Sequence, residues 1–209
     1  MSKRYSYPTF ATQDVELIGQ QSLYSGFFTL NKYKFKHKLF NGGWSNIVER
    51  ELLERGHAVA MLPYDPVKDS VVLVEQIRVG ALNQALPWQL EIVAGMLDKP
   101  NESPAEVAKR EAMEESGLEV QDLQHITGYY PSAGGCSERI ELFIGCVDAP
   151  NEGGVFGVAS ENEDIKVHIF SREQAYELVK NGTIENASSI MALQWLMLNY
   201  EQVRASWQN

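Results

Sequence analysis

Cysteine is scarce in this 209-residue sequence: only Cys136 and Cys146 are present, and they form no CxxC pair. Disulfide frameworks and thiolate metal sites need several spaced cysteines, so we expect neither, and two free thiols indicate a reducing compartment. The sequence has no apolar run of roughly 18 residues, which excludes a membrane-spanning helix. Residues 1–10, MSKRYSYPTF, have no apolar core, so no signal peptide is expected. A cytoplasmic protein with no membrane partner is predicted.

Positively charged residues are also few. The sequence has 18 Lys and Arg but 28 Asp and Glu, which gives a net charge of −10. Nucleic-acid-binding surfaces carry clustered Lys and Arg, and no such cluster is present, so no nucleic-acid partner is expected. An acidic protein that acts on an anionic substrate must offset the repulsion locally. Metal ions and a few well-placed arginines would provide that offset.

Residues 1–55 are expected to form an N-terminal β subdomain, and residues 56–209 the main domain. Lysines alternate with mostly apolar residues from Asn31 to Phe40, which predicts a half-buried strand. Asn41-Gly42 predicts a hairpin turn, and residues 44–53 predict the returning strand. The lysine row is interpreted as a solvated face that protects an edge strand. Because such a meander cannot bury itself alone, we expect it to pack on the main domain or on a second subunit.

The main domain has the pattern of an α/β fold, a mixed sheet flanked by helices. Ser171 with Gln174, like Ser103 with Glu106, predicts a helix that begins with a capping box. Strands are expected at residues 58–62, 70–79, 88–94, 123–130, 140–147 and 165–170, and helices at 171–180 and 187–207.

The sequence is organised around the segment from Gly95 to Leu118. Within it, the Ser103 capping box is followed by Pro104 at the first helical position, and Gly117 predicts the end of the helix. The spacing of Glu111, Glu114 and Glu115 places three carboxylates on one face of that helix.

Three clustered carboxylates repel one another unless a cation lies between them. One interpretation is a solvated acidic face that is balanced by Lys109 and Arg110. We favour another, because the apolar run around Ile92 and the Ala94-Gly95 turn precede the helix. A strand that brings a backbone carbonyl to these carboxylates would create an all-oxygen site, which suits Mg²⁺.

The same segment resembles the Nudix box, G-x5-E-x7-R-E-U-x-E-E-x-G-U, where U is aliphatic or small. Six residues instead of five separate Gly95 from Glu102, and the extra residue falls in the loop before the helix. The fixed positions are occupied by Gly95, Glu102, Arg110, Glu111, Ala112, Glu114, Glu115, Gly117 and Leu118.

Outside the box, the chain resembles the bacterial ADP-ribose pyrophosphatases of this family. The resemblance covers LYSGFF at 23–28, ERGHA at 54–58, EQIR at 75–78, PWQLEIVAG at 87–95 and ENED at 161–164. It implies a Nudix α/β/α sandwich with a mixed sheet, preceded by an N-terminal antiparallel β subdomain. It further implies a homodimer whose N-terminal subdomains are exchanged, and Mg²⁺-dependent hydrolysis of ADP-ribose to AMP and ribose 5-phosphate.

The resemblance also assigns roles to residues. The metal ligands would be the Ala94 carbonyl, Glu111 and Glu115, with Glu114 as an additional or shared one, for two or three Mg²⁺ ions that Mn²⁺ could replace. Glu102 and Arg110 would form a supporting ion pair.

For the substrate, the resemblance implies that Phe27 and, from the partner chain, Arg50 enclose the adenine. Arg78 would contact the diphosphate. Ser132 and Glu138 would lie near the terminal ribose. Glu161 would be the general base, with Glu163 beside it.

Two alternatives remain. Ser132-Ala133-Gly134-Gly135 stands where ADP-ribose hydrolases usually have Ser-Pro-Gly-Gly, which leaves open a hydrolase of GDP-mannose or another nucleoside diphosphate sugar. A Nudix domain that senses ADP-ribose without catalysis is the second alternative. Its box would normally be degraded, whereas the glutamates here are complete.

Overall fold

The protein is described by a computed structural model that covers residues 9–208, apart from the side chain of Glu161. It divides into two compact units. One contains the described residues up to Arg55 together with Ser132–Glu138, and the other contains Gly56–Pro131 and the residues from Arg139 onward. Within residues 9–208, none of the helices combines the length and the apolar character that a bilayer crossing requires.

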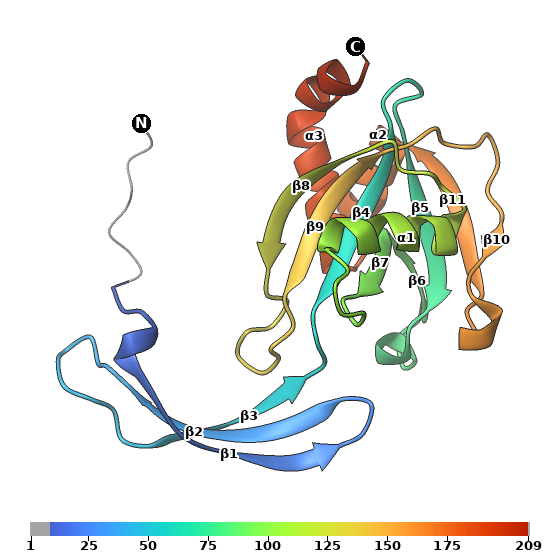
Figure 1. The fold of residues 1–209 in the computed structure, drawn as a ribbon. Coiled ribbons are helices and arrows are strands. Elements are labelled where there is room, and N and C mark those ends of the chain that lie inside the picture. Colours follow the sequence, from blue (N-terminus) through green and yellow to red (C-terminus); the bar gives the residue numbers. More distant parts are fainter. Residues whose placement is uncertain (1–8, 209) are drawn as a thin grey trace. The chain divides into compact units, whose positions relative to one another are not determined.

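The first unit is built on a three-stranded antiparallel sheet in the order β1-β2-β3 (Figure 1). The expected hairpin is present: Gly42 and Gly43 both have positive φ, and Leu39 donates its backbone N–H to the Gly43 carbonyl at 3.1 Å. The sheet's elements are η1 (Thr12–Asp14), β1 (Val15–Ser25), β2 (Thr29–His37) and β3 (Val48–Glu54).

Two features of this unit differ from the sequence prediction. The returning strand begins at Val48 rather than Trp44, because the Ser45 hydroxyl accepts the backbone N–H of His37, and only an isolated bridge joins Lys38 to Trp44. The strand β1 was not predicted. The segment Ser132–Glu138 lies beside β3, where Leu53 donates its N–H to the Gly135 carbonyl at 2.9 Å.

The second unit is a mixed eight-stranded sheet between helices. The order is β10-β11-β5-β4-β9-β8, with β6 paired to β5 and β7 paired to β4. Only β4 and β9 pair in parallel. The elements are β4 (Ala58–Asp65), β5 (Ser70–Ile77), η2 (Val79–Ala81), β6 (Trp88–Glu91), β7 (Val93–Met96), α1 (Pro104–Ser116), β8 (Asp122–Tyr129), β9 (Ile140–Cys146), β10 (Val155–Phe156), η3 (Ala159–Glu161), β11 (Ile165–Ser171), α2 (Arg172–Lys180) and α3 (Ala187–Trp207).

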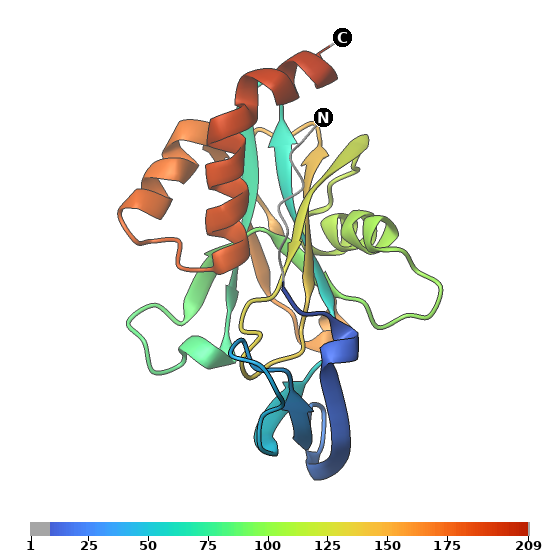
Figure 2. The same cartoon turned by 90° about the vertical axis from the view of Figure 1, so that its left-hand side faces the viewer.

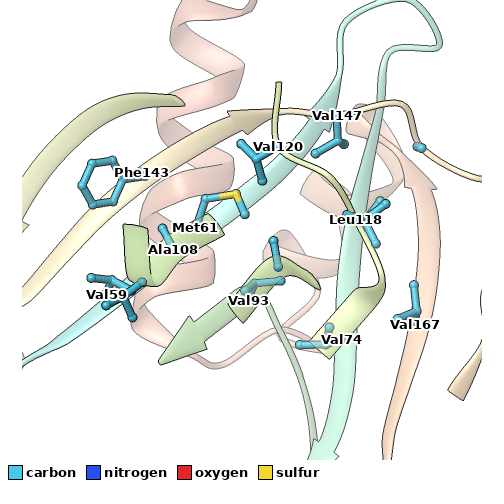
Figure 3. Close-up of a cluster of buried hydrophobic side chains, with 14 of the residues drawn as sticks. Val59, Met61, Val74, Val93, Ala108, Leu118, Val120, Phe143, Val147 and Val167 are labelled. Atoms are coloured by element: carbon cyan, nitrogen blue, oxygen red, sulfur yellow. The ribbon is translucent and has the colours of Figure 1, made fainter. Parts of the chain in front are cut away.

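Helices cover both faces of this sheet, as predicted for an α/β/α sandwich. Figure 2 shows α1 on one face and α2 with α3 on the other. One buried cluster lies between the sheet and α1, where Met61, Val93 and Phe143 approach Ala108 (Figure 3). The second cluster joins the opposite face to α3 through Leu193 and Leu196. The box helix is therefore fixed against the centre of the sheet.

The segment expected to form one strand over residues 88–94 is divided at Ile92. β6 pairs with β5, whereas β7 pairs with β4. The physical cause is that Ile92 donates its backbone N–H to the hydroxyl of Ser189 at 3.0 Å rather than to a neighbouring strand. The chain thereby passes from one strand partner to the other directly before Ala94 and Gly95. Similarly, β5 ends at Ile77, so that Arg78 follows the strand and Val79 starts a short 3-10 turn.

Candidate active site

The helix α1 begins and ends as predicted. The Ser103 hydroxyl accepts the Glu106 backbone N–H at 3.3 Å, and the Glu106 carboxylate accepts the Ser103 N–H at 2.8 Å. Gly117 adopts the left-handed conformation with φ 67°. The capping residues thus determine which helical positions carry the box glutamates.

Glu115 is the most enclosed of these glutamates, with 3% of its surface exposed. Its Oε2 accepts the backbone N–H of Ala94 at 3.1 Å, and its Oε1 lies 3.4 Å from the amide nitrogen of Gln76. Burial raises the pKa of Glu115 to about 8, and the nearby charge of Glu111 adds to this effect. The strand β7 and the end of β5 therefore hold this carboxylate in one orientation.

Glu111 lies one turn earlier, against the backbone of Gly95. A Cβ atom at position 95 would overlap the Glu111 carboxylate, so the carboxylate can take this position only while residue 95 has no side chain and would otherwise have to shift. Burial raises the pKa of Glu111 to about 7; Arg110 opposes the shift, while Glu114 and Glu163 add to it. The loop between β10 and β11, residues 157–164 and called the late loop below, thus places Glu163 close enough to act on Glu111 electrostatically.

Arg110 connects the carboxylates of the helix. Its Nε lies 3.2 Å from Glu102, and its Nη1 lies 2.8 Å from both Glu111 and Glu114. The planar guanidinium can serve several carboxylates at once, which a lysine could not do with the same geometry. Glu102 and Arg110 therefore contact each other, although they are eight residues apart.

The late loop is attached to the C-terminal half of α1. Gly157 donates its N–H to the Glu114 carbonyl at 3.3 Å, and the Glu163 carboxylate accepts the Val158 N–H at 3.1 Å. The backbone of Glu161 belongs to η3, and its side chain lies outside the described part of the chain. Of the two candidates for the general base, Glu161 and Glu163, only Glu163 therefore has a described side-chain position.

Arg78 has a partner that the sequence analysis did not identify. Its Nε and Nη2 lie 2.8 and 2.7 Å from Oε2 of Glu91, a residue with 5% of its surface exposed. One feature of the sequence could have indicated this pair: Glu91 is a single charged residue between the apolar Leu90 and Ile92. Charged side chains are rarely buried unless they are paired, so a buried Glu91 would need a cationic partner.

The remaining predicted residues belong to the first unit. Phe27 is 86% exposed and meets Phe28 edge to face. Arg50 lies on β3 and donates to the Glu49 carbonyl at 2.8 Å. The Ser132 carbonyl accepts the backbone N–H of Cys136 at 2.9 Å. Glu138 is buried and lies 3.3 Å from Arg55.

The donors of the second unit suit a divalent cation, although among the described side chains no three of His, Cys, Asp or Glu are gathered in a way that could hold a metal ion. Glu115 is buried and Glu111 is half-buried. Burial disfavours the charged form of both carboxylates; the charge of Glu111 adds to this effect at Glu115, and the charges of Glu114 and Glu163 add to it at Glu111. A cation would relieve both costs, and an all-oxygen donor set matches hard ions such as Mg²⁺.

Comparisons with known proteins agree with this geometry. The sequence matches the NUDIX domain over residues 54–193. It is 50% identical over 200 residues to the ADP-ribose pyrophosphatase of Escherichia coli K12, covering 95% of both chains. It is 51% identical over 202 residues to the ADP-ribose pyrophosphatase of Haemophilus influenzae, covering 95% of this chain and 93% of the other.

More distant proteins share the fold. A GDP-mannose pyrophosphatase of Shigella flexneri is 33% identical over 193 residues, covering 90% of this chain and 98% of that protein. A crystal structure of an ADP compounds hydrolase superimposes with a TM-score of 0.67 at 21% identity, covering 90% and 97% of the two chains. The domain match, which includes the box helix and its glutamates, and the similarity to these relatives show that the chain belongs to the Nudix family.

Proposed function

We propose that the protein is an ADP-ribose pyrophosphatase, which hydrolyses the diphosphate of ADP-ribose to AMP and ribose 5-phosphate. The observation that carries the proposal is the carboxylate pair of the buried Glu115 and the half-buried Glu111, in a chain that is 50% identical to bacterial ADP-ribose pyrophosphatases over 95% of its length. Their helix is fixed at both ends by its caps, so the pair is held in place before a substrate binds.

Mg²⁺ is the proposed cofactor, in two or three ions per site, with Mn²⁺ able to substitute. Glu111, Glu115 and the Ala94 carbonyl would hold it, and Glu114 would add a further oxygen. When bound, such ions neutralise charge on the diphosphate and lower the pKa of a coordinated water. Arg110 and Glu102 support the arrangement, because the guanidinium contacts both Glu111 and Glu114.

A general base must accept the proton of the attacking water, and the late loop supplies two carboxylates for this role. We assign it to Glu161, with Glu163 as the neighbouring alternative. The Glu163 carboxylate accepts a hydrogen bond from the Val158 N–H. The charge of Glu163 also raises the pKa of Glu111. A positioned base of this kind contributes about 10² to 10⁴-fold to the rate.

The substrate contacts are proposed from both units and from two protomers. Phe27 of one protomer and Arg50 of the partner subunit would enclose the adenine by stacking and cation–π contact. Arg78 would bind the diphosphate, and Ser132 with Glu138 would lie near the terminal ribose.

A homodimer with exchanged N-terminal subdomains is consistent with the first unit, which is a single three-stranded sheet. Its exposed side chains include Leu17, Tyr24, Phe27 and Phe40, which are 61%, 63%, 86% and 85% exposed. Several large apolar side chains exposed in one small unit are typical of an interaction site. We further propose a cytoplasmic location, which agrees with the free thiols of Cys136 and Cys146.

A GDP-mannose hydrolase is the second candidate, because GDP-mannose pyrophosphatases align with most of the chain and Ala133 replaces the usual proline. The purified protein should be assayed with Mg²⁺ against ADP-ribose, GDP-mannose and other nucleotide sugars. A preference for GDP-mannose would replace the first proposal. Calorimetric binding of ADP-ribose without turnover would instead indicate a sensor.

The central test is product analysis with ADP-ribose in ¹⁸O-labelled water. AMP and ribose 5-phosphate are expected, and the label identifies which phosphorus is attacked. In parallel, Glu115→Gln should lose far more activity than Glu161→Gln, and its Mg²⁺ dependence should weaken. Near wild-type rates for Glu115→Gln would contradict the metal assignment, and a Glu163→Gln variant slower than Glu161→Gln would reverse the assignment of the base.

A further inference from the structure

The buried residue Glu91 belongs to a chain of hydrogen bonds that ends at Arg78. Oε2 of Glu91 accepts both Nε and Nη2 of Arg78, and its Oε1 accepts the side-chain amide of Asn186 at 2.9 Å. Asn186 precedes α3 as its N-cap, and its Oδ1 accepts the backbone N–H of Ser189 at 3.1 Å. The Ser189 hydroxyl in turn accepts the N–H of Ile92 at 3.0 Å and lies 3.1 Å from Oδ1 of Asn186.

The direction of every bond in this chain is determined. A backbone N–H can only donate, so Oδ1 of Asn186 must face Ser189, and its amide nitrogen must face Glu91. An ionised carboxylate can only accept, so Glu91 suits Asn186 on one side and Arg78 on the other. A glutamine at position 91 could accept a hydrogen bond from only one of its two neighbours, Asn186 or Arg78. Its amide nitrogen would then face the N–H donor of the other. The site therefore requires a carboxylate rather than any polar residue.

The Arg78 guanidinium is oriented by this arrangement, but it is not enclosed by it. Two of its five N–H donors point to Glu91, and among the described side chains Arg78 has no other hydrogen bond or ion pair, although its charge also acts to lower the pKa of Glu115. Its backbone is fixed as well, because Arg78 donates its N–H to the Pro87 carbonyl at 2.9 Å. With 43% of the side chain exposed, three donors of a preoriented cation remain free for an anion.

We propose that Glu91, held by Asn186, is a positioning residue that sets the orientation of Arg78 for the diphosphate of the substrate. This inference rests on the proposed function, since it assumes that Arg78 binds a diphosphate. Glu91 does not touch the substrate itself. The N-terminus of α3 thereby fixes two parts of the site, Arg78 through Glu91 and the β6–β7 transition through Ile92.

A double-mutant cycle tests the proposal. Glu91→Gln should raise the KM for ADP-ribose about tenfold, with kcat changed less than about threefold, because a misdirected charged hydrogen bond weakens binding. In an Arg78→Ala background, the same substitution should change kcat/KM less than about twofold, since its target is absent. Asn186→Ser keeps a helix cap but removes the donor to Glu91, and should raise KM about threefold. Glu177→Gln, at an exposed position of α2, is the control.

Binding of ADP in the presence of Mg²⁺, measured by calorimetry, provides a readout independent of turnover. Glu91→Gln should weaken ADP binding about tenfold in the wild-type background and hardly at all beside Arg78→Ala. Equal losses in both backgrounds, or no ADP binding by the wild type, would overturn the positioning role. Wild-type protein that binds ADP but does not turn over ADP-ribose would refute the proposed activity alone, and the ADP cycle would still decide the role of Glu91.

Discussion

Replacing Glu115 by glutamine should make the protein more stable in alkaline, metal-free buffer while it destroys activity. The Glu115 carboxyl has a pKa of about 8 in the folded protein against 4.5 as its ordinary value, so it keeps a proton after folding that the unfolded chain would release. At a pH between these two pKa values, the unfolded state binds fewer protons than the folded state. The free energy of unfolding therefore falls as the pH rises through this range.

The magnitude follows from the size of the shift. One pKa unit corresponds to about 1.4 kcal/mol, so Glu115 should remove roughly 3 to 4 kcal/mol of stability between pH 5 and pH 8. Glutamine has no charge to bury and lacks this loss. The substitution is also sterically compatible. The new amide can direct its oxygen to the Ala94 N–H, while Gln76, whose amide contacts Glu115, can turn to present its own oxygen.

The assay is urea denaturation with EDTA at pH 5 and at pH 8, repeated with Mg²⁺. The difference in unfolding free energy between variant and wild type should grow by the stated amount from pH 5 to pH 8. Mg²⁺ at pH 8 should stabilise the wild type more than the variant, because only the carboxylate binds it strongly. Glu177→Gln, whose side chain is 64% exposed beside Lys180, should retain the wild-type slope. Parallel pH slopes for wild type and Glu115→Gln would refute the reasoning.

Three further predictions concern the box helix. Gly95→Ala should lower Mg²⁺-dependent kcat/KM about 100-fold, because its Cβ displaces the Glu111 carboxylate; a loss below threefold in steady-state assays would contradict this geometry. Ser103→Ala should lower the free energy of unfolding by about 1 kcal/mol in urea titrations through loss of the helix cap, whereas Ser103→Asp should retain it. Arg110→Lys should reduce kcat about tenfold with an unchanged melting temperature, since one ammonium cannot replace the guanidinium's contacts; rates equal to wild type would show that charge alone suffices.

Features with a local physical cause were predictable from the sequence. The limits of α1 follow from Ser103 and Gly117, and the hairpin follows from Asn41-Gly42, because caps and turns depend on neighbouring residues. The spacing of the box glutamates likewise predicted a common helix face, and the ends of α2 were given by Ser171 and Asn181-Gly182 in the same way.

Features that depend on distant partners were not predictable. The strand β1 carries Leu17 and Ile18 on exposed positions, so it has no alternation between a buried and a polar face. The break at Ile92 depends on Ser189, 97 residues later, and no local signal marks it. The pairing of Glu91 with Asn186 was missed for the same reason, since a lone glutamate in an apolar segment does not reveal its partner.

The parallel pairing of β4 with β9 has a consequence for synthesis on the ribosome. Ala58 pairs with Ile140, so a nascent chain that has emerged only as far as Gly117 contains all the box glutamates but lacks the strand that completes the centre of the sheet. Contacts between such distant segments form late and slowly. The acidic helix can therefore meet β4 and β7, which precede it in the chain, as soon as it emerges, whereas the centre of the sheet stays incomplete until β9 has been translated.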